Sequence, residues 1–242
     1  MHAKLSPSSA YRWLNCPGSV KLSQEAPYEE PSEYALEGTF AHGKGEYNLI
    51  AYVPNTVKTF YAPITYKGKK NKELTKAVNT YLNYAYDLID ASDHHLIEAR
   101  VKYNKQIYGT ADLICFDEML NTLVVVDYKH GAGVSVDVVN NPQLIIYGLA
   151  ALNHVTKPHL YHYITLAICQ PRVKSGNKIK TWTVPIAELK EQWEPTINRA
   201  IKAVKNNPNR CIVGSHCRWC PGATLCPEQQ KSRIDTAKKD FE

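Results

Sequence analysis

Two aspartates and a lysine stand at the ends of two successive strand-like segments of this sequence. Asp112 lies in the run 108–116, and Asp127 and Lys129 end the run 122–129. Because side chains alternate along a strand, Asp127 and Lys129 are expected on the same face. Hydrolysis of a phosphodiester needs divalent cations held by oxygen ligands, a water made acidic by such a cation, and a positive group near the phosphate. The two aspartates can supply the oxygen ligands, and Lys129 can supply the positive charge.

Further polar side chains recur at helical spacing on both sides of these strands. His42 follows a Gly-Thr pair, and Glu46 lies one turn later on the same face of a predicted helix. Gln143 and Tyr147 are also one turn apart, so both can face the same phosphate. Glu98 lies on the preceding strand, where a cross-strand pair with a basic neighbour is the alternative to a role in the site.

These motifs together resemble the PD-(D/E)xK nuclease superfamily, and specifically its RecB-type branch, which includes the CRISPR-associated iron-sulfur exonucleases and the AddB nuclease domain. Ala111 occupies the position of the proline in the family's name. The resemblance implies a site for Mg²⁺ or Mn²⁺ with four ligands: His42, Asp112, Asp127 and the main-chain carbonyl of Tyr128.

By the same resemblance, the remaining polar residues surround the metal. Glu46 and Glu98 would be accessory acidic groups. Lys129 would orient or help to deprotonate the attacking water and offset charge on the phosphate. Gln143 and Tyr147 would contact the phosphate or the bound strand.

The seven cysteines indicate metal ligands and reduced core thiols rather than disulfides, because the N-terminus shows no signal-peptide pattern. Three form a C-x2-C-x5-C run near the C-terminus, and one lies alone near the N-terminus. In the iron-sulfur members of the branch this pattern holds a [4Fe-4S] cluster that fastens the chain ends together, which implies four cluster ligands: Cys16, Cys217, Cys220 and Cys226.

Alternatives to this cluster stay open at the level of the sequence. Cys211 precedes the C-terminal run, and Cys211 or His216 could replace Cys16 as the fourth ligand. Four thiolates would also suit a structural Zn²⁺. Cys115 and Cys169 fall inside strand patterns, which predicts inert core thiols at both positions.

Hydrophobic periodicity predicts an α/β protein. Helices are expected over 6–13, 32–52, 72–90 and 141–153, with a long helix after Pro185; strands are expected at 95–103, 108–116, 122–129, 160–170 and 179–184. Ser6 is expected to cap the first helix and Pro17-Gly18 to end it. This order is that of the restriction-endonuclease-like αβββαβ core. One nuclease domain over 1–242 is therefore expected, with its core at about 32–205 and an iron-sulfur cap from 1–20 and 206–230.

Bulk properties suit a polyanionic partner. Lysine and arginine outnumber aspartate and glutamate by 29 to 23, which gives a net charge of +6. The chain has 242 residues, of which 44% are hydrophobic, and no run of eighteen apolar residues. A cytoplasmic protein without a membrane segment is expected, located in the host cytoplasm if a phage encodes it.

The resemblance implies a metal-dependent DNA exonuclease of phage-type recombination or DNA end processing, with a single-strand annealing protein as a partner. Two alternatives remain. The first is a structure-selective or nicking DNA endonuclease with the same core, because the catalytic residues do not encode a need for a DNA end. The second is a non-catalytic, zinc-containing DNA-binding module, which would have no need for Asp112, Asp127 and Lys129.

Overall fold

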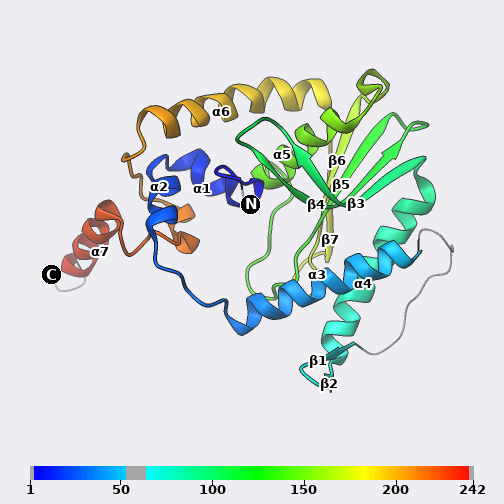
Figure 1. The fold of residues 1–242 in the computed structure, drawn as a ribbon, viewed down its shortest axis with the longest axis horizontal. Coiled ribbons are helices and arrows are strands. Elements are labelled where there is room, and N and C mark those ends of the chain that lie inside the picture. Colours follow the sequence, from blue (N-terminus) through cyan, green and yellow to red (C-terminus); the bar gives the residue numbers. More distant parts are fainter. Residues whose placement is uncertain (1–2, 53–63, 240–242) are drawn as a thin grey trace.

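The computed structural model describes residues 3–52 and 64–239 of the chain. Helices flank a central β-sheet on both faces (Figure 1). In chain order the helical segments are η1 (Pro7–Ser9), α1 (Ala10–Asn15), α2 (Gly18–Glu25), α3 (Glu33–Tyr52), α4 (Lys72–Ala91), α5 (Pro142–Ala151), η2 (Leu152–His154), η3 (Pro158–Leu160), α6 (Ile186–Asn206), η4 (Ser215–Trp219) and α7 (Pro227–Lys239).

The central sheet is mixed and has five strands in the order β3-β4-β5-β6-β7. Only the pairing of β5 with β6 is parallel, and helix α5 makes the connection between these two strands. The strands of this sheet are β3 (His94–Lys102), β4 (Tyr108–Asp117), β5 (Thr122–Tyr128), β6 (Tyr163–Cys169) and β7 (Ile179–Pro185). A separate two-stranded sheet consists of β1 (Thr65–Tyr66) and β2 (Lys69–Lys70).

Two apolar cores lie on opposite faces of the five-stranded sheet. Alternate side chains of a strand enter different cores: Ile114 and Val125 pack with α1, α5 and α6, whereas Leu113 and Val126 pack with α3 and α4. Because both faces are covered, the central strands are apolar at nearly every position rather than at every second one. This mixed α/β architecture agrees with the α/β expectation, and the order from α4 to β6 is helix, three strands, helix, strand.

Helix α5, which carries Gln143 and Tyr147, is buried along most of its length. The side chain of Asn141 caps it by accepting hydrogen bonds from the amides of Gln143 and Leu144 at 3.0 and 3.3 Å, and Pro142 stands in the first turn. The expected start at Asn141-Pro142 is thereby confirmed. Gln143 consequently lies in the first turn, beside the end of β5.

The N-terminal region differs from the expected single helix over 6–13. Three short segments, η1, α1 and α2, follow one another, and Gly18 begins α2 instead of only ending a helix. Ser6 makes no capping bond, because its hydroxyl bonds that of Ser9 at 2.8 Å and its carbonyl accepts from the Trp13 indole at 3.0 Å. The strands β1 and β2 and helix α7 were not predicted either.

The segments near the two chain ends lie side by side. The Tyr11 hydroxyl bonds that of Ser215 at 2.5 Å, and Arg12 donates to the carbonyl of Trp219 at 3.2 Å. In Figure 1 this is the region where α1 and α2, in blue, meet the orange segment that precedes α7. Among the described residues, none of the helices combines the length and apolar character needed to cross a bilayer.

Candidate metal centre

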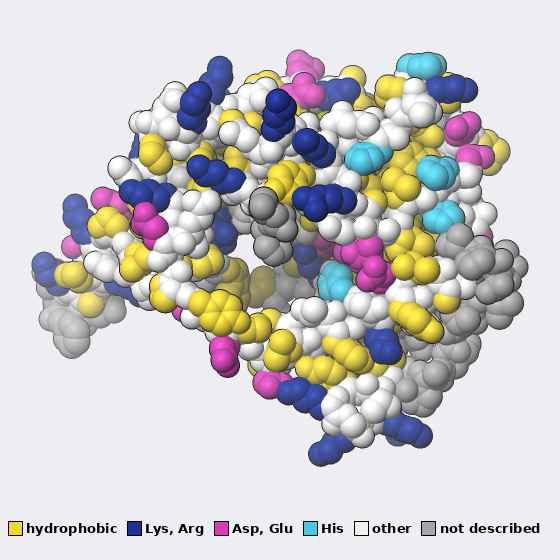
Figure 2. Space-filling model, viewed as in Figure 1, with side chains coloured by type: hydrophobic (Ala, Val, Ile, Leu, Met, Phe, Trp, Pro, Cys, Tyr) yellow, Lys and Arg dark blue, Asp and Glu magenta, His cyan; other side chains and the backbone are white. Residues whose placement is uncertain are grey.

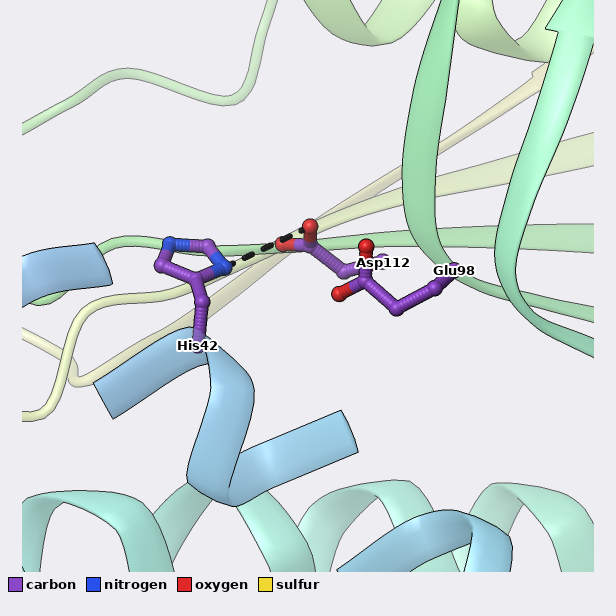
Figure 3. Close-up of side chains that lie close together, drawn as sticks. All are labelled: His42, Glu98 and Asp112. Atoms are coloured by element: carbon purple, nitrogen blue, oxygen red, sulfur yellow. Dashed lines mark ion pairs between the residues drawn. The ribbon is translucent and has the colours of Figure 1, made fainter. Parts of the chain in front are cut away.

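Three potential metal ligands from three different elements converge. His42 projects from the middle of α3, Glu98 from β3 and Asp112 from β4, and one ligand atom of each lies within 4.8 Å of the other two (Figure 3). The group combines one imidazole nitrogen with two carboxylates. Such a set suits divalent cations that accept both nitrogen and oxygen ligands, Mn²⁺ among them.

Glu98 reaches this point through an unusual backbone conformation. Its φ is 45°, in the left-handed region, and it lies between the pairs Ile97–Leu113 and Ala99–Ala111, opposite Asp112. Burial raises the pKa of Glu98 to about 7, and the nearby charge of Asp112 adds to the shift. A bound cation would relieve this crowding of carboxylates.

Asp112 is held from two sides. Its Oδ2 accepts a hydrogen bond from the main-chain amide of Tyr128 at 2.6 Å, and its Oδ1 lies 3.5 Å from Nδ1 of His42. Burial alone would lower the pKa of His42, but the hydrogen bond and charge of Asp112 outweigh burial and raise it. The His42 side chain is 37% exposed, so a cation could approach the group from solvent.

Asp127, Lys129 and Gln143 form a second polar group next to the first. The Gln143 side chain donates to Oδ1 of Asp127 at 2.6 Å and accepts from Nζ of Lys129 at 2.9 Å. Lys129 Nζ also lies 2.9 Å from Oδ2 of Asp127, so both side chains point to one face, as the strand alternation predicts. The charge of Asp127 contributes to the raised pKa of both His42 and Glu98, which shows that the two groups are electrostatically linked.

The second oxygen of Asp127 is incompletely satisfied. Oδ2 is buried and has the ion-pair contact with Lys129, yet no contact with hydrogen-bond geometry. Burial raises the pKa of Asp127, although the charge of Lys129 opposes that shift. A buried carboxylate oxygen with spare coordination capacity, beside an imidazole and two further carboxylates, fits a divalent cation.

Tyr147 lies one turn after Gln143 on α5 and is buried. Its ring packs on Gly109 of β4: a Cβ at Gly109 would lie 3.1 Å from the tyrosine ring and 3.2 Å from its hydroxyl oxygen. Only glycine leaves this much room. Burial raises the pKa of Tyr147, so the phenol is neutral and available as a hydrogen-bond donor.

A buried network that the sequence analysis missed lies behind the metal centre. Nδ1 of His130 bonds the Tyr128 hydroxyl at 2.8 Å, and Nε2 lies 3.0 Å from Glu37 Oε1 and 2.8 Å from Nη1 of Arg172. Arg172 also pairs directly with Glu37, and its Nε donates to Glu73 at 2.9 Å. The network joins α3, α4, the end of β5 and the loop after β6. The available signal was that His130 and Arg172 come two and three residues after the ends of the neighbouring strands β5 and β6.

Of the residues predicted to bind the metal, His42 and Asp112 lie together with Glu98. Asp127 belongs to the neighbouring polar group, where it pairs with Lys129. Glu46 is half-buried one turn further along α3, and its charge adds to the raised pKa of Glu98. Tyr128 adjoins Asp112 through its main-chain amide.

The cysteines of the two chain ends also meet. Burial and hydrogen bonds with Cys226 and Cys16 raise the pKa of Cys211 to about 12, and the amide of Ile212 lies 3.4 Å from Sγ of Cys16. Cys217 and Cys220 are half-buried on and directly after η4. Cys211, the residue weighed only as a substitute ligand, therefore lies between Cys16 and Cys226.

The two other cysteines, Cys115 and Cys169, are buried in the core that α3 and α4 cover, as expected. Burial raises the pKa of each to about 12. Both are therefore protonated, unreactive thiols at neutral pH.

Figure 2 shows a hollow near the middle of the visible face. Acidic side chains and a histidine line one wall of the hollow, hydrophobic side chains follow part of its rim, and lysine and arginine side chains lie above it. A polyanionic chain could approach such a hollow along its basic side.

The family model described as "Protein of unknown function (DUF2800)" matches residues 2–242. Among solved structures, a candidate exonuclease from Eubacterium rectale is 12% identical, covers 88% of this chain and 86% of its own, and gives a TM-score of 0.47. A protein designated SSO0001 is 14% identical, covers 91% of this chain and 96% of its own, and gives a TM-score of 0.36.

Proposed function

This chain belongs to the DUF2800 family, and we propose that it is a metal-dependent DNA nuclease with the catalytic plan of the PD-(D/E)xK superfamily. The observation that carries the proposal is the convergence of His42, Glu98 and Asp112 within 4.8 Å, beside the ion pair of Asp127 with Lys129. Cation ligands next to a positioned lysine form the combination that phosphodiester hydrolysis requires.

The chain's own residues would divide the chemistry as follows. A bound Mg²⁺ or Mn²⁺ would act as a Lewis acid toward the phosphate and make a water more acidic. Lys129, held by Gln143 and Asp127, would orient the attacking water and offset negative charge that develops on the phosphate. Tyr147, as a neutral phenol, would donate a hydrogen bond to the phosphate or to the strand.

DNA is the proposed substrate, and attack from an end is the proposed mode. The net charge of +6 favours a polyanion. Acidic side chains line one wall of the hollow in Figure 2 and basic side chains lie above it, so a strand end that entered the hollow would meet both. A role in phage-type recombination or end processing, beside a single-strand annealing protein, is what the resemblance to the RecB-type branch implies. A cytoplasmic location goes with that role.

We further propose that the cysteines near the chain ends hold a [4Fe-4S] cluster, with Cys16, Cys217, Cys220 and Cys226 as ligands. The contact of Cys211 with both Cys16 and Cys226 supports a shared metal site between the two ends. The terminal segments would then form a cap on a single nuclease domain, whose core lies at about 32–205.

The decisive experiment compares end-labelled linear duplex, single-stranded DNA and a covalently closed circle, each with Mn²⁺, with Mg²⁺ and with EDTA. We expect linear DNA to be shortened progressively from its ends in the presence of a divalent cation and the closed circle to resist. Activity should fall steeply as salt rises, because binding depends on phosphate contacts.

The alternatives have their own outcomes in this experiment. Efficient cutting of the closed circle would replace the exonuclease with an endonuclease and leave the metal site as assigned. A protein that binds Mn²⁺ and DNA but cleaves no substrate would reject the nuclease and favour the non-catalytic binding module.

A further inference from the structure

The helix that carries His42 is fixed at a second point by the network around His130. Glu37 lies on α3 five residues before His42, and it contacts His130 at 3.0 Å and pairs with Arg172. The side chains of His130, Arg172 and Glu37 are only 4%, 17% and 20% exposed. These three residues, with Tyr128, are called the clamp below.

A second route from the clamp to His42 runs through Tyr128. The Tyr128 ring meets the His42 ring edge to face, with centroids 5.0 Å apart, and stacks on Tyr81 of α4 at 4.8 Å. The Tyr128 hydroxyl is fixed by His130, and its main-chain amide is fixed by Asp112. One residue of β5 therefore touches both His42 and Asp112.

The state of His130 does not weaken this route. Burial lowers the pKa of His130, so the ring is neutral at neutral pH. If Nε2 carries the proton it donates to Glu37, and Nδ1 accepts from Tyr128. If Nδ1 carries the proton it donates to the Tyr128 hydroxyl, and Nε2 accepts from Arg172. Either tautomer holds the Tyr128 ring.

Burying an ion pair is a poor way to stabilise a fold, because desolvation of both charges offsets most of their attraction. The clamp has a different effect that apolar residues would not reproduce, since directional bonds set the rotation and the axial position of α3. An error of about 1 Å in that position would take His42 out of the range of Asp112.

We propose that Glu37, His130 and Arg172 are positioning residues that set the affinity of the centre for its divalent cation by holding His42 beside Asp112 and Glu98. This inference rests on the proposed metal site, but not on the identity of the substrate. It assigns Glu37, which lies on the same helix as His42, an action through that one ligand rather than through Asp112 or the Asp127–Lys129 pair.

A thermodynamic cycle on Mn²⁺ binding tests the assignment, with calorimetry on the full-length protein as the measurement. Glu37→Gln should weaken Mn²⁺ binding by about 10-fold or more, the usual effect of losing a residue that orients a ligand. His42→Ala should weaken it at least as much. In the His42→Ala background, Glu37→Gln should have no further effect, because the ligand that Glu37 positions is gone.

Two further variants provide the controls. Glu73 is the outer partner of Arg172, and the Glu73 side chain is 68% exposed. Glu73→Gln should therefore change Mn²⁺ affinity by less than about twofold. Arg172→Lys keeps the charge but cannot bond both Glu37 and Glu73, and it should weaken binding in the same direction as Glu37→Gln. It also keeps the test valid if Glu37→Gln folds poorly.

The outcomes separate this proposal from the nuclease itself. Unchanged Mn²⁺ affinity in Glu37→Gln, or an equal weakening with and without His42, would overturn the clamp. Wild-type protein that binds no Mn²⁺ would overturn the clamp together with the metal centre. Protein that binds Mn²⁺ with the expected cycle but cleaves no DNA would support the clamp and reject the nuclease.

Where DNA cleavage is observed, the kinetics give an independent readout. Glu37→Gln should need a higher Mn²⁺ concentration for half-maximal rate, with the rate at saturating Mn²⁺ close to that of wild type. A loss of rate that saturating Mn²⁺ fails to restore would contradict action through His42 alone.

Discussion

Glu98 and Asp112 lie opposite each other in the antiparallel pairing of β3 with β4, and Glu98 reaches that position with a φ of 45°. A residue other than glycine in this region costs about 1–3 kcal/mol of backbone strain. Burial beside Asp112 adds an electrostatic cost that appears as a pKa of about 7 for Glu98. Strain and like-charge crowding at one residue are both offset if the residue binds a cation.

The first prediction is that Glu98→Gln raises the thermal stability of the metal-free protein and reduces the stabilisation that Mn²⁺ gives. The pKa of Glu98 rises from 4.5 to about 7 on folding, so ionisation of Glu98 destabilises the fold. This destabilisation is absent well below pH 4.5, grows between pH 4.5 and pH 7, and is complete above pH 7. In EDTA at pH 8, Glu98→Gln should therefore unfold at a higher temperature than wild type. Mn²⁺ should raise the unfolding temperature of wild type more than that of the variant.

Thermal unfolding at pH 4.5 and pH 8, each with EDTA and with Mn²⁺, checks this prediction. The advantage of the variant in EDTA should shrink toward pH 4.5, where Glu98 of the wild type is protonated in the folded state and half protonated in the unfolded state. A variant that is less stable than wild type in EDTA at pH 8 would contradict the electrostatic account of this residue.

The second prediction concerns the Asp127–Lys129 pair. Asp127→Asn keeps the shape and a hydrogen bond to Gln143 but removes the negative charge, and it should abolish DNA cleavage by weakening cation binding. Lys129→Ala should lower the rate by roughly 10²–10⁴-fold, because water orientation and charge stabilisation are lost. Initial rates on end-labelled DNA over a range of Mn²⁺ concentrations are the measurement.

Lys190 on α6 is exposed and provides the control for loss of a positive charge. Lys190→Ala should keep the wild-type rate. Wild-type cleavage by Asp127→Asn or by Lys129→Ala would remove these residues from the catalytic assignment.

Local patterns predicted the elements around the site well, and for a physical reason. The apolar runs of β4 and β5 and the Asn141-Pro142 start of α5 depend on neighbouring residues only. Alternation along β5 then sufficed to put Asp127 and Lys129 on one face. Here the local chemistry and the tertiary structure agree.

Other features depend on contacts between distant residues and had no local signal. His130 meets Glu37 from 93 positions away, and Arg172 meets it from 135 positions away. The left-handed φ of Glu98 is imposed within a segment that otherwise has a plain strand pattern. The separate helix α2 after Cys16 was missed because Pro17-Gly18 was interpreted as a helix end, whereas proline and glycine also occur at helix starts.

The third prediction is a pH dependence of stability at Glu37. Burial alone would raise the pKa of Glu37, but hydrogen bonds and charge from His130 and Arg172 outweigh burial and lower it below 4.5. The ionised carboxylate therefore stabilises the fold at pH values above 4.5, and this contribution is lost as pH falls through the lowered pKa. Glu37→Gln should be less stable than wild type at pH 7.

The difference in unfolding free energy between wild type and Glu37→Gln should shrink as the pH falls below 4.5. Urea unfolding across this range in EDTA is the measurement, and Glu73→Gln, at an exposed carboxylate, is the control with little effect at any pH. A difference that is the same at every pH would show that the ionised form of Glu37 has no special role.

The fourth prediction concerns the cysteines of the chain ends. Protein prepared without oxygen should be brown and should contain iron and sulfide, and Cys220→Ser should lose colour, iron and thermal stability together. Cys115→Ser, at a buried thiol in the core, is the control that should keep the iron. Colourless protein with one zinc ion per chain would replace the cluster with a Zn²⁺ site.

The fourth ligand is decided by comparing Cys16→Ser with Cys211→Ser. Both thiols lie within hydrogen-bonding distance of each other, so position alone does not separate a ligand from a neighbour. If Cys16 completes the C-x2-C-x5-C run, Cys16→Ser should lose the iron and Cys211→Ser should keep it. The reverse result would assign Cys211 as the ligand, because its thiol contacts that of Cys226 as well as that of Cys16.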